Sequence, residues 1–315
     1  MGHFVDGIWQ AGWYAADSKG HFVRPATTYR EPLQAQALER GDYLLYVSLA
    51  CPWAHRTLLM RALLGLEDKI DLAVVDWLID DNSWAFRPER ASCTPDPLGP
   101  SEYLREVYLR ADRHYTGRCT VPICWDKARG TIVNNESREI IRHLCVLSTQ
   151  RWNFRPSAQV DAVIDKLYPS INNGVYRCGF ASSQAAYDEA VDTLFAALDE
   201  WESILAQQPF AAGLRLSEAD LCFFTTLVRF DPVYLVHFKC SKKRLRDYPH
   251  LHGYLRSLYQ LPKVADTVNF EHIRGHYYSS HLHLNPTGIV AALPEDDLNA
   301  PHDRWQLFPQ AEFPS

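Results

Sequence analysis

The stretch YVSLACPWAHRTLLMRALLGL, residues 46–66, decides the fold of the N-terminal half of the chain. The residues before Cys51 are apolar and favour a β-strand, whereas leucine, methionine and alanine recur at helical spacing after it. Pro52 suits the first turn of this helix, because the N–H that proline lacks would have no intrahelical partner there. The stretch therefore predicts a strand followed by a helix, with Cys51 at the helix N-terminus.

This position of Cys51 predicts a reactive thiol. Backbone N–H groups and the positive end of the helix dipole favour a thiolate at a helix N-terminus. A buried structural cysteine is the alternative interpretation, since cysteines outside disulfides are often buried. Ala54 stands where a C-x-x-C motif carries its second cysteine, so Cys51 cannot close a disulfide within such a motif.

Composition limits the classes of protein to consider. The 315 residues suffice for two domains, 47% of them are hydrophobic, and the formal net charge is −6. The only short basic cluster, KCSKKRLR, does not indicate nucleic-acid binding, and the absence of about 18 consecutive apolar residues argues against a membrane span. The first ten residues do not resemble a signal peptide. Eight scattered cysteines predict reduced thiols in a cytoplasmic protein.

The order of strand and helix signals predicts the domain organisation. Residues 1–42 read as an irregular arm, and residues 43–147 read as an α/β domain on a small mixed sheet. A long loop is expected over residues 81–103. Residues 148–315 read as an all-helical domain with an irregular tail from residue 269. Ser217 and Asp220 fit the N-cap and N3 positions of a capping box that begins one of its helices.

Two short motifs in the α/β domain predict a binding site. In TVPIC, Pro122 can form a cis bond in a tight turn and Val121 can offer its backbone to an extended peptide, although a plain edge strand is the alternative. In NNES, Glu136 and Ser137 fall in the first turn of a helix, where an anion binds. The γ-glutamyl end of glutathione carries a carboxylate and an ammonium that would suit this pair. An ordinary helix cap is the alternative.

These features together resemble the glutathione site of thioredoxin-like domains, and the whole chain resembles the glutathione transferase superfamily. From DGIW near the N-terminus to NPTGI, nearly the full chain is similar to the glutathionyl-hydroquinone reductases, or xi-class transferases. The segments that carry this resemblance are SLACPWAHR, TVPI, NES, NNGVYRCGFA, TTLVRFDPVY, HFKC, and HYYSSH with NPTGI. The resemblance implies a thioredoxin-like α/β domain followed by an all-α domain, in a homodimer. The chain departs from the family at Ser83-Trp84, where Gly-Trp is common, and in a short segment before NNGVY.

The resemblance also implies a reaction and its residues. Glutathione would be the co-substrate, and a glutathionyl-hydroquinone would be reduced through a mixed disulfide on Cys51. Tyr176 matches the proton donor of the family, and Tyr234 and Tyr277 match tyrosines that hydrogen-bond the thiolate. The expected glutathione contacts are Trp84, Arg118, Cys119, Thr120, Val121, Glu136 and Ser137. Cys119 also fits a packing role beside the Val121 strand.

Other functions stay open at this stage. A different cysteine-type activity, such as glutaredoxin-like disulfide reduction or dehydroascorbate reduction, needs the same thiol. A non-enzymatic binding module with this fold is a further alternative, although it has no need of a reactive cysteine. We expect no metal, because the tail histidines His272, His276, His281 and His283 lack the compact ligand set of a zinc site.

Overall fold

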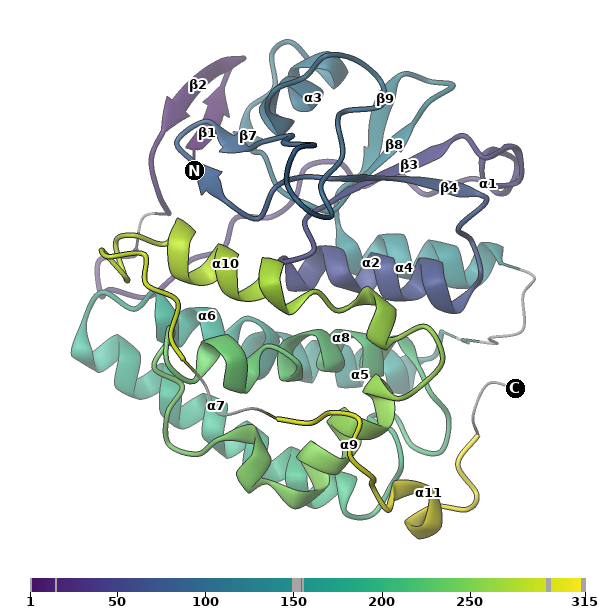
Figure 1. The fold of residues 1–315 in the computed structure, drawn as a ribbon, viewed down its shortest axis with the longest axis vertical. Helices are drawn as coiled ribbons and strands as arrows, with labels where there is room; N and C mark the ends of the chain where they lie inside the picture. The colour runs from purple at the N-terminus through teal and green to yellow at the C-terminus, as the bar shows by residue number, and fades with distance from the viewer. Residues whose placement is uncertain (1, 15, 149–153, 155, 293–295, 313–315) are drawn as a thin grey trace. The chain divides into compact units, whose positions relative to one another are not determined.

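The computed structural model describes residues 2–14, 16–148, 154, 156–292 and 296–312. Contacts among the residues divide the chain into two compact units (Figure 1). The first unit comprises Met1–Trp13, Pro25–Thr149 and Thr267–Val290, and the second comprises Tyr14–Arg24, Gln150–Asp266 and Ala291–Ser315. The first is a mixed α/β unit and the second is helical, as the sequence predicts. The domain boundaries at residues 42 and 147 stay a prediction.

A four-stranded sheet in the order β4-β3-β8-β9 forms the centre of the first unit. β3 pairs in parallel with β4 and antiparallel with β8, and all its residues are buried because it lies inside the sheet. The crossover between the parallel strands contains α2, which packs against α4 (Figure 1). The bounds are β3 Tyr43–Val47, α2 Pro52–Leu63, β4 Ile70–Val74, β8 Ile123–Asp126, β9 Thr131–Asn134 and α4 Ser137–Leu147.

The N-terminal arm is irregular only in part, because it contains a hairpin and a short helix that were not predicted from the sequence. β1 and β2 form an antiparallel hairpin, and β1 also pairs with β7. Asp6 and Gly7 both have positive φ, 48° and 74°, as a two-residue Asp-Gly hairpin turn requires. This Asp-Gly signal was available in the sequence and marks the hairpin. The bounds are β1 Gly2–Val5, β2 Ile8–Ala11, α1 Ala35–Arg40 and β7 Gly117–Arg118.

The predicted loop after β4 contains a small hairpin of β5 (Ile79–Asp80) and β6 (Ser83–Trp84), and α3 (Leu104–Ala111) follows it. The predicted irregular tail contains the helix α10 (Phe270–Ser280), which belongs to the first unit. Asn269 caps this helix by accepting a hydrogen bond from His272 N. α10 packs closely on Trp77, where a Cβ on Gly275 would lie 2.9 Å from the indole ring.

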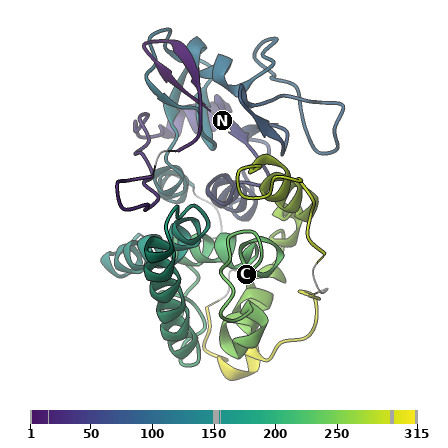
Figure 2. The same cartoon turned by 90° about the vertical axis from the view of Figure 1, so that its left-hand side faces the viewer.

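The second unit is built from helices, of which α7 is the longest (Figure 1, Figure 2). The predicted capping box at α8 is present, with Ser217 N donating to Asp220 Oδ2 at 2.8 Å. Asp220 is fully buried and also accepts hydrogen bonds from Ala211 N and Tyr254 Oη. The bounds are α5 Ala158–Leu167, η1 Tyr168–Asn172, α6 Gly174–Gly179, α7 Gln184–Leu205, α8 Glu218–Leu227, η2 Phe230–Tyr234, η3 Leu245–Asp247, α9 Pro249–Tyr259, η4 Ala265–Thr267 and α11 Arg304–Leu307.

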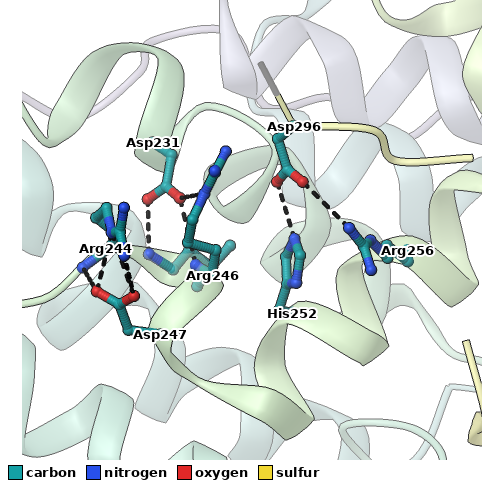
Figure 3. A network of polar contacts seen from close by, with 8 residues as sticks. Asp231, Arg244, Arg246, Asp247, His252, Arg256 and Asp296 are labelled. Carbon is teal, nitrogen blue, oxygen red and sulfur yellow. Dashed lines mark hydrogen bonds and ion pairs between the residues drawn. The ribbon is translucent and has the colours of Figure 1, made fainter. Parts of the chain in front are cut away.

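Polar contacts fasten the tail to α9 within the second unit (Figure 3). His252 Nε2 lies 2.8 Å from Asp296 Oδ2, and Arg256 Nη2 donates to Asp296 Oδ1 at 3.3 Å. Asp231 accepts a hydrogen bond from Leu245 N at 2.6 Å and so holds the start of η3. The two contacts of Asp296 give this part of the tail fixed partners on α9.

Candidate active site

Cys51 is the N-cap residue of α2, and Pro52 is the first residue of the helix, as the sequence predicts. Cys51 has extended backbone angles, φ −75° and ψ 122°, and its carbonyl accepts the hydrogen bond from His55 N. Its side chain is partly exposed, and Sγ lies 3.5 Å from the carbonyl oxygen of Val121. Ala54, in the place of a second cysteine, is fully buried in α2.

The other cysteines differ from Cys51 in their surroundings. Six of the eight are buried, and Cys93 is the only other partly exposed one. Burial and the nearby Asp76 carboxylate raise the pKa of Cys93 to about 11, so this thiol is protonated at neutral pH. Burial also raises the pKa of Cys119 and of Cys124. Of the two partly exposed cysteines, Cys51 is therefore the one whose position at a helix N-terminus favours a thiolate.

The TVPI segment lies opposite Cys51, and its Val121-Pro122 bond is cis. The Tyr108 hydroxyl binds both backbone groups of Thr120, donating to its carbonyl at 2.9 Å and accepting from its N–H at 3.1 Å. The backbone N–H and carbonyl of Thr120 are therefore both already hydrogen-bonded to Tyr108. Cys119 is buried and packs inside the protein. Of this segment, the Val121 backbone is the part that the structure brings to Cys51.

Glu136 and Ser137 begin α4, with Glu136 as the N-cap and Ser137 as the first helical residue. Glu136 Oε1 accepts from Arg138 N at 3.2 Å, and Oε2 accepts from the hydroxyl of Thr27 at 3.2 Å. The Ser137 hydroxyl accepts a hydrogen bond from Arg56 Nη1 at 3.4 Å. The carboxylate and the hydroxyl thus lie together at a helix N-terminus, the arrangement expected for an amino-acid carboxylate and ammonium.

Arg118 and Trp84 contact different parts of the first unit. The Arg118 guanidinium donates to the carbonyl of Trp13 at 3.1 Å, so the residues after the N-terminal hairpin help to hold it. Trp84 is buried and stacks on the ring of His276, with ring centres 4.8 Å apart. His276 Nδ1 lies 2.8 Å from the carbonyl oxygen of Trp77, which fixes the imidazole against this loop.

Tyr277 follows His276 on α10 and is buried in the first unit. The rings of His276 and His281 meet it edge-on, at 5.1 and 5.5 Å between ring centres. Ser280 Oγ accepts a hydrogen bond from Ile79 N at 3.1 Å and anchors the end of α10 to β5. The predicted site residue on the tail therefore belongs to the same unit as Cys51.

Tyr176 and Tyr234 belong to the second unit, where their ring centres lie 6.1 Å apart. Tyr234, in η2, is buried and stacks on Phe238 with an angle of 8° between the rings. Tyr176, in α6, packs against Phe238 and lies under the Arg24 guanidinium at 4.6 Å. Arg24 also donates to Asn173 Oδ1 at 2.9 Å, which holds its charge over the phenol ring.

Sequence reasoning missed several residues that contact the predicted site residues. Arg24 and Thr27 lie in the arm, where neither has a pattern that marks it. His276 was weighed only as a metal ligand. Arg56 is part of the quoted CPWAHR motif, and its spacing of three from Trp53 was the available signal for their contact on one helix face.

Two absences concern only the part of the chain that the structure describes. Within it, no group of three or more histidine, cysteine, aspartate and glutamate side chains is placed to hold a metal ion. None of its helices combines the length and apolar character needed to cross a bilayer.

Comparison with known families matches both units. The family model for the glutathione S-transferase N-terminal domain matches residues 50–147, and that for the C-terminal domain matches residues 184–257. These matches include Cys51, the TVPI segment and the start of α4.

Individual proteins are similar over nearly the whole chain. Glutathionyl-hydroquinone reductase YqjG of Escherichia coli is 47% identical over 98% of this chain and 100% of its own length. Its glutathione-bound structure superposes with a TM-score of 0.85 at 46% identity, covering 96% of this chain and 99% of that one. Glutathionyl-hydroquinone reductase PcpF of Sphingobium chlorophenolicum is 45% identical over 95% of this chain and 98% of its own. A xi-class transferase structure from Natrialba magadii has a TM-score of 0.90 at 46% identity, with 97% of each chain covered.

Proposed function

Because the chain belongs to the glutathionyl-hydroquinone reductases, the xi class of the glutathione S-transferases, we propose that it reduces glutathionyl-hydroquinones with glutathione. The observation that carries the proposal is Cys51 at the N-cap of α2, with Ala54 in the place of a second cysteine. Such a site forms a mixed disulfide and needs an external thiol to resolve it.

The reaction has two steps that balance. The Cys51 thiolate attacks the sulfur of the glutathionyl group, the carbon–sulfur bond breaks, and the aromatic carbon leaves with the electron pair. That carbon takes a proton and becomes the hydroquinone, while Cys51 keeps glutathione in a mixed disulfide. A second glutathione thiolate attacks the glutathione sulfur of this disulfide, which releases glutathione disulfide and restores Cys51.

The first unit supplies the residues for the glutathione group. We assign its γ-glutamyl ammonium to the Glu136 carboxylate and its carboxylate to the Ser137 hydroxyl, because these groups lie together at the start of α4. The Val121 backbone would pair with the cysteinyl residue of glutathione, as an added strand does. Arg118 and Trp84 would contact the remainder, Arg118 as a cation for the glycine carboxylate.

The tyrosines take their roles from the family resemblance. Tyr176 would donate the proton to the leaving carbon, for which a phenol with pKa near 10 is a suitable acid. Tyr234 and Tyr277 would donate hydrogen bonds to the Cys51 thiolate and so favour it over the thiol. All three rings are buried, which shields the phenol groups from bulk water.

A homodimer in the cytoplasm is the assembly and location that we propose. The family resemblance supports the dimer. A reducing compartment suits both the glutathione-dependent reaction and eight cysteines, none of which forms a disulfide. Light scattering of the purified protein tests the dimer, and a mass of one chain, 36.1 kDa, would contradict it.

Product analysis tests the function. The protein is incubated with glutathione and a chlorinated glutathionyl-hydroquinone, and the hydroquinone and glutathione disulfide are quantified. We expect equal amounts of both products, and none from Cys51→Ala, which cannot form the mixed disulfide. Cys93→Ala is the matched control, because Cys93 is also partly exposed but has a raised pKa. Turnover by Cys51→Ala, or faster reduction of a small mixed disulfide than of the hydroquinone conjugate, would contradict the proposal.

A further inference from the structure

The carboxylate and hydroxyl at the start of α4 are each held by a side chain from a distant part of the chain. Thr27 binds Glu136, and Arg56 binds Ser137. Both contacts lie within the first unit. They reach the two groups from different elements, Thr27 from the arm and Arg56 from the helix of Cys51.

The arm segment that carries Thr27 is fixed by backbone hydrogen bonds along β9. Glu31 N donates to Val133 O at 2.9 Å, and Asn135 N donates to Tyr29 O at 3.0 Å. Because the backbone two residues away is held, Thr27 does not have to lose much freedom to place its hydroxyl on Glu136. The hydroxyl donates to Oε2 while Arg138 N donates to Oε1, so one bond on each oxygen sets the plane of the carboxylate.

Arg56 determines which role the Ser137 hydroxyl plays. An arginine can only donate hydrogen bonds, so Ser137 Oγ must accept from it, and the hydroxyl hydrogen is left to point elsewhere. A hydroxyl that is ready to donate suits a carboxylate ligand. Arg56 is itself 3% exposed, and its guanidinium lies over the Trp53 ring at 4.4 Å, which fixes its direction.

We propose that Thr27 and Arg56 are positioning residues for the two charged groups of the γ-glutamyl end of glutathione. Thr27 acts through Glu136 on the ammonium, and Arg56 acts through Ser137 on the carboxylate. This inference rests on the proposed function, because it needs glutathione at the start of α4. The inference goes beyond that function in assigning a separate positioning residue to each charged group, so the effect of each residue can be tested by itself.

Two glutathione analogues separate the two supports in a calorimetric binding assay. Glutaryl-cysteinyl-glycine lacks the ammonium, and 4-aminobutyryl-cysteinyl-glycine lacks the carboxylate. The unmodified protein should bind each analogue about ten- to hundredfold more weakly than glutathione. We call the factor by which an analogue's Kd exceeds that of glutathione the ammonium penalty or the carboxylate penalty, after the group that the analogue lacks. In Thr27→Val the ammonium penalty should shrink by about three- to tenfold, and the carboxylate penalty should not change. In Arg56→Met the carboxylate penalty should shrink and the ammonium penalty should stay.

Matched variants control for general damage to the fold. Thr28→Val removes the neighbouring hydroxyl, which contacts Tyr115 and not Glu136, and should leave all three affinities unchanged. Thr27→Ser keeps a hydroxyl and should restore the ammonium penalty. Arg56→Lys keeps the buried charge and a donor for Ser137 Oγ, so it should restore the carboxylate penalty that Arg56→Met reduces.

Binding separates this inference from the proposed reaction. Equal weakening of all three ligands by Thr27→Val would show a general structural role and overturn the inference. An unmodified protein that does not discriminate between glutathione and the analogues would overturn both the inference and the glutathione assignment at α4. Normal discrimination without any hydroquinone product would leave the inference standing and contradict the reductase function.

Discussion

Replacing Ser83 with glycine is expected to stabilise the protein. Ser83 begins β6 after the two-residue turn at residues 81–82, and its φ is +90°, a region that favours glycine. The residue is 1% exposed, and among the described residues its hydroxyl has no hydrogen-bond partner. The family resemblance implies glycine at this position, and the positive φ would give the physical reason.

Two separate costs make up the expected gain. A left-handed backbone costs a residue with a Cβ about 1–2 kcal/mol, which glycine avoids. Glycine gives back about 0.5–1 kcal/mol of this gain, because it has greater conformational freedom in the unfolded chain. A buried hydroxyl without a partner costs a further 1–3 kcal/mol or so. Ser83→Gly should therefore raise the free energy of unfolding by about 1–4 kcal/mol. Ser83→Ala removes the hydroxyl and keeps the Cβ, so it should recover only the hydroxyl part.

Urea unfolding followed by fluorescence, with thermal melting beside it, measures both variants. The order of stability should be glycine, then alanine, then serine. Glutathione affinity should change little, since Trp84 keeps its stacking on His276. If Ser83→Gly is less stable than the unmodified protein, or if the alanine variant exceeds the glycine variant, the reasoning from backbone strain is refuted.

Four further changes test the site and its support. Ala54→Cys should allow an internal disulfide to Cys51 under mild oxidation, and mass spectrometry that finds no such bond would contradict the placement of Ala54 as the second position of the motif. Tyr176→Phe should slow turnover by about 10²-fold or more while the pH dependence of Cys51 alkylation stays the same. Tyr277→Phe should instead move that alkylation curve to higher pH, and the opposite pattern would exchange the two roles. Burial opposes ionisation of Asp96, but hydrogen bonds from serine and arginine side chains outweigh it and lower the pKa of this carboxyl. The stability that Asp96 contributes is thus present above the unfolded pKa near 4 and is lost as the pH falls through the lower folded pKa. Asp96→Asn should cost about 1–3 kcal/mol at pH 7 and less below about pH 4, and an equal loss in urea melts at both pH values would contradict this.

Local signals explain which parts of the fold and site were predictable. Pro52 directly after Cys51 marks a helix start by residue type alone, and the Ser217–Asp220 spacing does the same for α8. These signals act within one helical turn, so no tertiary contact is needed to read them. The helix start at Glu136 was predictable for the same reason.

Other features depend on contacts between residues far apart in the sequence. The helix α10 has no clear apolar period, because its histidines and tyrosines are buried by the loop of Trp77 and by His281. The contact between Thr27 and Glu136 joins residues 109 positions apart and has no local pattern. The exchange of serine for the family's glycine at position 83 was visible, but the positive φ that explains it was not.

The arm along β9 has a consequence for how the protein can be trimmed. β9 is the last strand of the four-stranded sheet, and the arm supplies partners there through Arg30 opposite Asn134 and the hydrogen bonds of Tyr29 and Glu31. Without the arm, these backbone groups would form an open edge, which other chains can join. A shortened protein that starts at β3 would therefore tend to aggregate, and a protease cut before residue 27 would be tolerated better than one at residue 33.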